Sequence, residues 1–378
     1  MVLMHKDIPV ADVIFQNGNI VSVSGVFSEK HLPVGTATPY KQLLPKTLSN
    51  WQKMRAIPSE RQDIRRIEQA LQCSVPEAAI KSLAVSLTDC YWFRPADTDL
   101  QWKDVNFHEN PFSVDFSEVI LDKSPKQIID FYIPDITTDG LLSKAWVYID
   151  GVPMLVKRGD LGEYSHGKNL LSANEIAAYK VALEMEINHV PYIPVIISAT
   201  DEIVCASPCF VTDPNQEYVN ALQIMQHENR SGMELYRHFC QLGMQKETDQ
   251  MILFDYIIHN TDRHEKNFGI MRDAETLEPI GMAPLYDSGS SFYWDHSQND
   301  IKPFVRARNS QLELLLNSPC DIPGPETVKM ILQETYEIFE INEKNFADAC
   351  KDIDATYEQL AMRELYQGRE YNVEDMEL

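Results

Sequence analysis

Two aspartates and an asparagine are the residues of this 378-residue chain best suited to chemistry. Asp262 and Asn267 lie in TDRHEKN, directly after a long apolar run, and Asp287 lies further along in LYDSGSS. Carboxylate and amide oxygens are the ligands that a hard cation such as Mg²⁺ prefers. The same side chains suit phosphoryl transfer, in which one aspartate orients the attacking hydroxyl group while an asparagine and a second aspartate hold the metal ion.

The segments that flank these residues are expected to bring them together. ETDQMILFDYIIHN, residues 247–260, predicts a buried helix that ends just before Asp262. Residues 267–292 predict a β-hairpin that returns Asp287 to the side of Asp262 and Asn267. Protein kinases space the Asp and Asn of their catalytic loop by the same interval, D-x-x-x-x-N. The interval alone is weak evidence, but together with the hairpin it predicts a kinase-type site.

A kinase also needs a lysine on a strand, to contact phosphates, and a glutamate on a helix, to hold that lysine. Lys157 ends the predicted strand PMLVK, and Glu175 lies in the first turn of a helix expected over residues 173–188. The glutamate has a second interpretation, because SANE, beginning at Ser172, also fits a capping box in which Glu175 contacts the start of its own helix.

The loop that would cover the phosphates contains few glycines. The turn TTDGLLSK precedes the lysine strand and contains only Gly140, whereas a kinase loop of the G-x-G-x-x-G type has three glycines. We therefore expect this loop to use backbone N–H groups together with Ser143 and Lys144.

Simpler interpretations exist for the residues around Asp262. Asp262 alone could be a turn residue after a helix. His259, Asp262 and His264 could be imagined as a zinc site, although their spacing does not match the i, i+4 pair of a helical zinc site. His264 fits a structural role in the loop, whereas Arg263 and Lys266 are expected either to be solvated or to touch the substrate.

NTDRHEKNFG followed by PLYDSGSS resembles the catalytic and metal-binding motifs of HipA-like serine/threonine kinases, the toxin components of some bacterial toxin–antitoxin pairs. DGLLSKAWVYIDGVPMLVK and ANEIAAY are similar to the phosphate loop, the lysine strand and the following helix of that family. The resemblance covers about residues 125–292. It implies ATP and Mg²⁺ as cofactors, a protein substrate and an antitoxin protein as a possible partner.

The resemblance also implies a role for each matched residue. These roles are catalytic base for Asp262, magnesium ligands for Asn267 and Asp287, phosphate contact for Lys157, and partner of that lysine for Glu175.

Two departures from the family pattern leave alternatives open. The triplet DRH satisfies the pattern DRHxxN of phosphoinositide kinases, so a lipid or small-molecule kinase with the same site is one alternative. A nucleotide-binding pseudokinase that acts as a regulatory module is the other, because the loop has so few glycines.

Ser143 is the nearest candidate for the serine that the family can autophosphorylate in this loop, although its flanking residues differ.

Composition restricts the partners. The chain has 33 Lys and Arg residues against 57 Asp and Glu residues, a net charge of −24, which disfavours stable direct binding to nucleic acid. No basic or amphipathic membrane-docking segment is evident.

The seven cysteines are scattered without a CxxC pair and are expected to be reduced thiols. We expect a cytoplasmic protein.

The predicted fold class is α+β, a bilobal protein-kinase-like fold with a β-rich N-lobe, a helical C-lobe and an N-terminal α/β module. The module is expected over residues 1–114, the N-lobe over 115–213 and the C-lobe over 214–378. DVIFQNGNIVSVSGVF predicts two strands joined at Asn17-Gly18. QEYVNALQIMQH, which starts at Gln216, is expected to be helical throughout, as is the region from about Pro325 onward.

Overall fold

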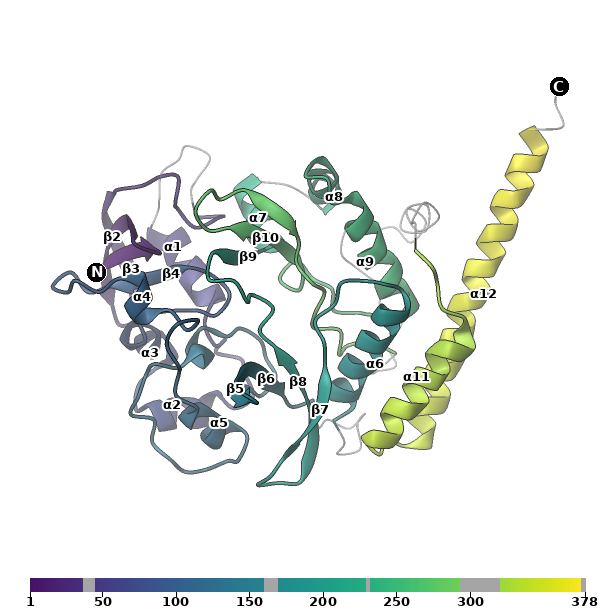
Figure 1. Cartoon of the computed structure of the whole chain (residues 1–378), viewed down its shortest axis with the longest axis horizontal. Coiled ribbons are helices and arrows are strands. Elements are labelled where there is room, and N and C mark those ends of the chain that lie inside the picture. Colours follow the sequence, from purple (N-terminus) through teal and green to yellow (C-terminus); the bar gives the residue numbers. More distant parts are fainter. Residues whose placement is uncertain (37–44, 160–168, 229–231, 293–319, 375–378) are drawn as a thin grey trace. The chain divides into compact units, whose positions relative to one another are not determined.

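Strands dominate one part of the fold and long helices the other (Figure 1). The computed structural model describes residues 1–36, 45–159, 169–228, 232–292 and 320–374. The chain divides into two compact units, and it passes between them several times. Unit 1 consists of Met1–Arg158, Ile193–Ser231 and Gly269–Ala283, and unit 2 consists of Gly159–Tyr192, Gly232–Phe268 and Pro284–Leu378.

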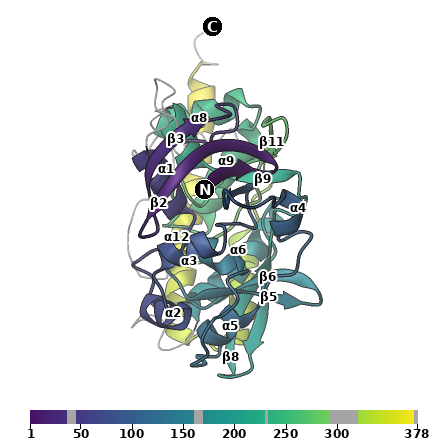
Figure 2. The same cartoon turned by 90° about the vertical axis from the view of Figure 1, so that its left-hand side faces the viewer.

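An antiparallel sheet of four strands opens unit 1. In the order β3-β2-β1-β4, its strands are β3 (Asn19–Val26), β2 (Ile8–Gln16), β1 (Val2–His5) and β4 (Tyr91–Arg94). Figure 2 shows β2 and β3 as a long curved hairpin. Its turn is at Asn17 and Gly18, both with positive φ, as predicted. β4 was missed, because the four residues YWFR are too short to show an alternating pattern and three of them are buried.

Short helices accompany this sheet within unit 1. They are α1 (Pro45–Met54), α2 (Ile64–Leu71), α3 (Val75–Lys81), α4 (Trp102–Val105), α5 (Asp115–Ile120) and the 3₁₀ helix η1 (Pro134–Thr137). Pro76 does not interrupt a helix. It lies in the first turn of α3, where its missing N–H group is not needed, and Ser74 and Glu77 form a capping box.

A second antiparallel sheet contains the predicted lysine strand. Its order is β5-β6-β8-β7, with β5 at Lys144–Ile149, β6 at Val152–Lys157, β8 at Glu202–Pro208 and β7 at Ile193–Ile197. β5 and β6 form a hairpin around Asp150 and Gly151, and both of these residues have positive φ. The register places Lys144 opposite Lys157.

The third sheet, in the order β11-β10-β9, corrects one prediction. β10 (Gly269–Asp273) and β11 (Pro279–Met282) form the expected hairpin, but β9 (Gln216–Asn220) also pairs with β10. The prediction that the whole stretch from Gln216 is helical was therefore wrong. α7 (Ala221–Glu228) starts only after Asn220, whose side chain accepts a hydrogen bond from the N–H group of Gln223 at 2.9 Å and so favours a helix start there.

Unit 2 consists mainly of long helices. They are α6 (Leu170–Glu184), α8 (Gly232–Gln241), α9 (Gln245–Ile257), α11 (Pro325–Ile338) and α12 (Glu343–Glu374). α6 packs against α11, whereas α9 packs against α8 and α12. The predicted C-terminal helices are confirmed. In the part of the chain that the structure describes, no helix combines the length and the apolar character needed to cross a membrane.

The mixed α and β architecture agrees with the predicted α+β class. The boundaries at 114 and 213 stay predictions.

Two hairpin glycines provide a matched test of the packing in unit 1. Gly18 and Gly151 both have positive φ, but a Cβ atom at Gly18 would lie 2.5 Å from Pro76 Cβ, whereas one at Gly151 would meet nothing within 4 Å. We expect Gly151→Ala to lower the free energy of unfolding by about 1 kcal/mol, the cost of left-handed backbone. Gly18→Ala should cost at least about 1 kcal/mol more, because the backbone of α3 must move. Urea denaturation measures both, and equal losses would contradict this packing.

Candidate active site

The segment after α9 positions Asp262 and Asn267. Asn260 is fully buried, and its side-chain oxygen accepts a hydrogen bond from the N–H group of Asp262 at 3.0 Å. The side-chain amide of Asn267 donates to the backbone carbonyl of Asp262 at 2.9 Å. The Asp262 side chain remains 54 % exposed, whereas Asn267 is 6 % exposed. In this loop the Asp262 carboxylate is exposed to solvent, whereas the Asn267 amide is buried and held by a hydrogen bond.

A fully buried arginine holds this loop in place. Arg263 donates from Nε to Asp255 at 3.0 Å and from Nη1 to the carbonyl of Asn267 at 2.9 Å. Nη1 also donates to the carbonyl of Tyr286, and Nη2 donates to Ser288 Oγ at 3.0 Å. One guanidinium group therefore connects α9, the loop of residues 260–267 and the turn at Asp287. The expectation that Arg263 is solvated or touches substrate was wrong, because its donors are all directed into the protein.

Asp287 lies on a strained turn with several supports. Its φ is 57°, a conformation that few residues other than glycine adopt. Its N–H group donates to the hydroxyl group of Tyr192 at 3.4 Å, and the N–H group of Ser288 donates to Glu175 at 2.8 Å. These bonds hold the turn on both sides of the Asp287 carboxylate.

Glu175 contributes to this turn and does not cap its helix. α6 begins at Leu170 after the N-cap residue Asn169, so Ser172 lies inside the helix and cannot be the N-cap. The capping-box interpretation was therefore wrong. Glu175 is 3 % exposed, and it holds the turn through the N–H group of Ser288.

Ser288 and His189 also support the turn. Ser288 lies in the motif LYDSGSS but was given no role there, and no motif indicated His189. His189 Nδ1 lies 2.7 Å from the carbonyl of Val190, which can only accept, so Nδ1 carries the proton. Its Nε2, 3.2 Å from Ser288 Oγ, then accepts from the serine hydroxyl group, while the same oxygen accepts from Arg263. A signal for Arg263 did exist. Asp255 interrupts the apolar run of α9, and a buried carboxylate requires a charged or hydrogen-bonding partner.

The two aspartates interact electrostatically. Partial burial raises the pKa of Asp262, and the negative charge of Asp287 raises it further, against the opposing charges of His264 and Arg263. Because 54 % of the Asp262 side chain is exposed, desolvation is incomplete, and the like-charged neighbour is the distinctive feature of the site.

This donor set fits a hard divalent cation. Two carboxylates that repel one another and a nearby amide oxygen are the ligand types of Mg²⁺, and a bound cation would relieve the repulsion. No cluster of three or more His, Cys, Asp or Glu side chains able to hold a metal ion occurs among the described residues. A magnesium set at this position therefore needs the amide of Asn267 as well as the carboxylates.

The other predicted residues lie in unit 1. Lys157 and Lys144 are 6 % and 7 % exposed. Gly140 has a φ of 112°, and a Cβ atom there would collide with the side chain of Lys144, which packs over it. The hydroxyl group of Ser143 donates to Asp63 at 2.6 Å. The structure thus gathers Asp262, Asn267, Asp287 and Glu175 in unit 2, and Gly140, Ser143, Lys144 and Lys157 in unit 1.

Asp135 of η1 is a buried carboxyl group just before the loop of residues 138–144. It is 1 % exposed, and one of its oxygens accepts from the N–H group of Trp146 at 2.8 Å. Burial raises the pKa of Asp135 to about 7, against the opposing effect of Arg61.

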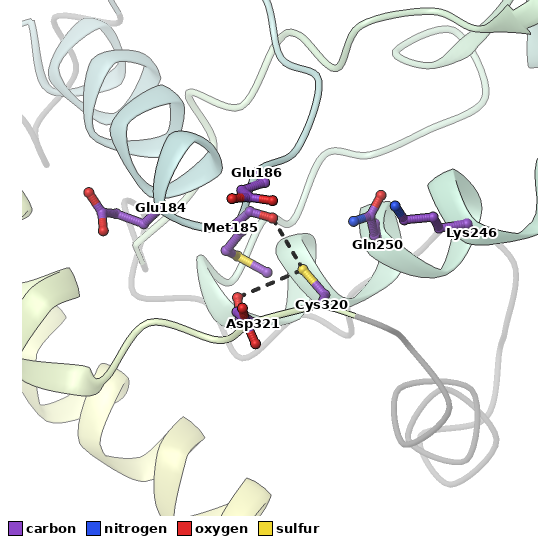
Figure 3. Close-up of a pocket in the computed structure, with 7 residues that line it drawn as sticks. All are labelled: Glu184, Met185, Glu186, Lys246, Gln250, Cys320 and Asp321. Atoms are coloured by element: carbon purple, nitrogen blue, oxygen red, sulfur yellow. Dashed lines mark hydrogen bonds between the residues drawn. The ribbon is translucent and has the colours of Figure 1, made fainter.

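A separate pocket of about 430 Å³ in unit 2 contains none of the predicted site residues. Its lining residues are Glu184, Met185, Glu186, Lys246, Gln250, Cys320 and Asp321 (Figure 3). The thiol group of Cys320 faces the carbonyl of Met185 at 3.4 Å.

Comparison with known proteins identifies the family. The model of the HipA-like C-terminal domain matches residues 140–359, more than half of the chain. The chain belongs to this HipA-like family. One similar solved structure is HipA of Shewanella oneidensis MR-1, in a toxin–antitoxin complex with HipB and operator DNA. The alignment covers 100 % of this chain and 100 % of that HipA chain, with a TM-score of 0.56 and 13 % identity. That likeness confirms the kinase-like fold.

The proinflammatory kinase CtkA of Helicobacter pylori aligns with 57 % of this HipA-like chain and 88 % of its own, with a TM-score of 0.43 and 16 % identity. No curated protein matches the sequence. Family membership supports phosphoryl transfer of the kinase type as the general activity.

The role of Arg263 can be tested with a substitution that keeps its charge. Arg263→Lys should lower the free energy of unfolding by roughly 3 kcal/mol, because an ammonium group cannot replace the planar fork and leaves buried acceptors unpaired. Thermal and urea unfolding measure the loss. Arg237→Lys, on the exposed surface of α8, is the matched control and should change stability little. A similar small effect at Arg263 would contradict its role as a buried connector.

The buried carboxyl group of Asp135 predicts a pH dependence. Its folded pKa lies above its ordinary value, so the folded state binds the proton more tightly, and this contribution to stability is lost as the pH rises from about 4 through about 7. Asp135→Asn keeps the acceptor for Trp146 but does not ionise. Relative to wild type, the variant should therefore gain roughly 2 to 3 kcal/mol between pH 5 and pH 8. Urea unfolding at both pH values measures the gain, and a pH-independent difference would contradict it.

Proposed function

We propose that this HipA-like chain transfers the γ-phosphate of ATP, with Mg²⁺, to a serine or threonine hydroxyl group of a protein. The observation that carries the proposal is the set of hydrogen bonds made by the buried guanidinium group of Arg263. This group donates hydrogen bonds to the loop that contains Asp262 and Asn267 and to the turn that contains Asp287, and so connects two segments that are about 20 residues apart in the sequence.

In this proposal Asp262 is the catalytic base. Its exposed carboxylate would accept a hydrogen bond from the substrate hydroxyl group, orient it for in-line attack and take its proton. A raised pKa favours this role, because it brings the proton affinity of the carboxylate closer to the working pH.

Asn267 and Asp287 would hold the magnesium ion. When bound, the ion would neutralise charge on the phosphates. The buried amide of Asn267 and the supported turn at Asp287 need little rearrangement to present their oxygens, which reduces the entropy cost of binding.

The unit 1 residues would contact the rest of the nucleotide. We assign the phosphate contact to Lys157, with Glu175 as its partner, and the covering loop to Gly140, Ser143 and Lys144. These roles follow from the family motif, and the burial of Lys157 and Lys144 makes their ammonium groups strongly dependent on compensating negative charge.

We also propose an antitoxin-like protein as a binding partner, because the HipA of Shewanella oneidensis was solved with HipB. The net charge of −24 favours a protein partner over direct and stable contact between this chain and nucleic acid.

Phosphate transfer tests the proposal directly. The purified chain, incubated with Mg²⁺ and radiolabelled ATP, should label proteins of a lysate on Ser or Thr, as mass spectrometry would show. Asp262→Asn should reduce transfer by about a hundredfold or more while Mg-ATP still binds, because only the base is removed. Asp287→Asn should instead weaken Mg²⁺-dependent ATP binding, which calorimetry measures. Asp321→Asn, an exposed aspartate of unit 2, is the control and should behave like wild type.

Other outcomes distinguish the alternatives. Label on phosphoinositide vesicles and not on protein would identify a lipid kinase. ATP binding without transfer to either acceptor would identify a pseudokinase. Full transfer by Asp262→Asn would refute the assigned base.

A further inference from the structure

The predicted phosphate loop has an unusual source of rigidity. A loop with several glycines can approach phosphates closely, but here Gly140 stands alone between residues 138 and 144. The fixed shape of the loop must therefore come from contacts with other segments. The structure shows four such contacts, all within unit 1 and all from the short segment 57–63, which precedes α2.

Two of these contacts are hydrogen bonds between backbone groups. The N–H group of Ile57 donates to the carbonyl of Ile136 at 3.3 Å, and that of Gln62 donates to the carbonyl of Leu141 at 3.4 Å. The two segments therefore run beside each other at the entry to the loop and in its middle.

The other two contacts involve charged side chains and form a closed ring. The hydroxyl group of Ser143 donates to Asp63 Oδ2 at 2.6 Å, and Arg61 Nη2 donates to the carbonyl of Lys144 at 2.6 Å. Arg61 Nε also donates to Asp63 Oδ1 at 3.0 Å, which joins the two charged residues. Hydrogen bonds to ionised groups are the stronger class, so this ring fixes the end of the loop where β5 begins.

The geometry of Asp63 indicates that this contact displaces an ordinary one. Asp63 is the N-cap residue of α2, where an aspartate normally accepts a hydrogen bond from an N–H group of its own helix. No such side-chain bond is present, because the carboxylate is directed at Arg61 and Ser143 instead. α2 therefore lacks the stabilisation of a side-chain cap, and the Asp63 carboxylate contacts the loop instead.

The burial of Arg61 costs free energy, because its charge is removed from water. Its side chain is fully buried, and burial lowers its pKa, against the opposing charges of Asp63 and Asp135. Among the described residues, Arg61 Nη1 and Asp135 Oδ2 lack a hydrogen-bond partner. A buried charge with an unsatisfied donor is not an efficient way to stabilise a fold, which favours a positional role for this arginine.

We propose that Arg61 and Asp63 are positioning residues that hold the phosphate-covering loop in its nucleotide-binding shape, in place of the flexible glycines of other kinase loops. This inference rests on the proposed function for the identity of the ligand, but the contact itself does not. It gives the segment before α2, which lies outside the matched family region, a direct part in nucleotide affinity.

A double-mutant cycle on the full chain tests the ring. Asp63→Asn should weaken Mg-ATP binding by about tenfold, because the ionised acceptor of the Ser143 hydroxyl group is lost. In a Ser143→Ala background the same substitution should have much less effect, since the shared contact is already absent. A purely structural role for Asp63 would give additive losses. Calorimetry measures the affinity, and the exposed Asp122→Asn is the control.

Hydrogen exchange provides a test that does not depend on ATP. In Asp63→Asn, the amides of residues 138–146 and of Gln62 should exchange several-fold faster than in wild type, with thermal unfolding showing that the variant is folded. If Asp63→Asn does not fold, Ser143→Ala, which keeps the pair of Arg61 with Asp63, should show the same faster exchange.

The outcomes separate this inference from the proposed function. Unchanged exchange together with unchanged Mg-ATP affinity overturns the inference and leaves the kinase assignment intact. Faster exchange with unchanged affinity overturns the link to the nucleotide. If wild type binds no Mg-ATP, the proposed function fails, and exchange alone decides whether the ring positions the loop.

Discussion

The buried pair of Arg263 and Asp255 is the constraint on which the candidate site depends. Removing two charges from water is expensive, and the cost is offset only when nearly every polar atom of the pair finds a partner. Asn260 and Ser288 supply some of these partners, and the carbonyl groups of Asn267 and Tyr286 supply others. Satisfying the arginine thus forces two loops to meet. The geometry of the site therefore follows from the need to give the buried polar atoms of this pair hydrogen-bond partners.

Local patterns in the sequence were sufficient for most elements near the site. Asn17-Gly18 and Asp150-Gly151 specify hairpins because their positive φ angles are a property of the turn itself. The stretch from Gln216 was misassigned because its strand exists only through pairing with β10, more than 40 residues later. Glu175 was ambiguous for a similar reason, since its partner at Ser288 is distant in the sequence.

The chemistry of the site was more predictable than its support. Asp262, Asn267 and Asp287 could be proposed as site residues because phosphoryl transfer requires those residue types at characteristic spacings. Supporting residues have no such signature, because any donor of suitable length could serve. His189, which supports the turn at Asp287, and Arg61, which contacts the loop of residues 138–144, are examples. Only Asp255, which interrupts an apolar run, could have indicated from the sequence that a buried partner was needed.

The left-handed turn at Asp287 has a consequence for the order of folding. The φ of 57° at Asp287 costs free energy at a residue other than glycine, and it is supported by Tyr192, by Glu175 through Ser288 and by Arg263 through Tyr286. Those supports span more than 80 residues of chain, and contacts of such long range carry a high entropy cost of loop closure. During synthesis on the ribosome, every earlier part of the site must therefore remain incomplete until residue 288 has emerged.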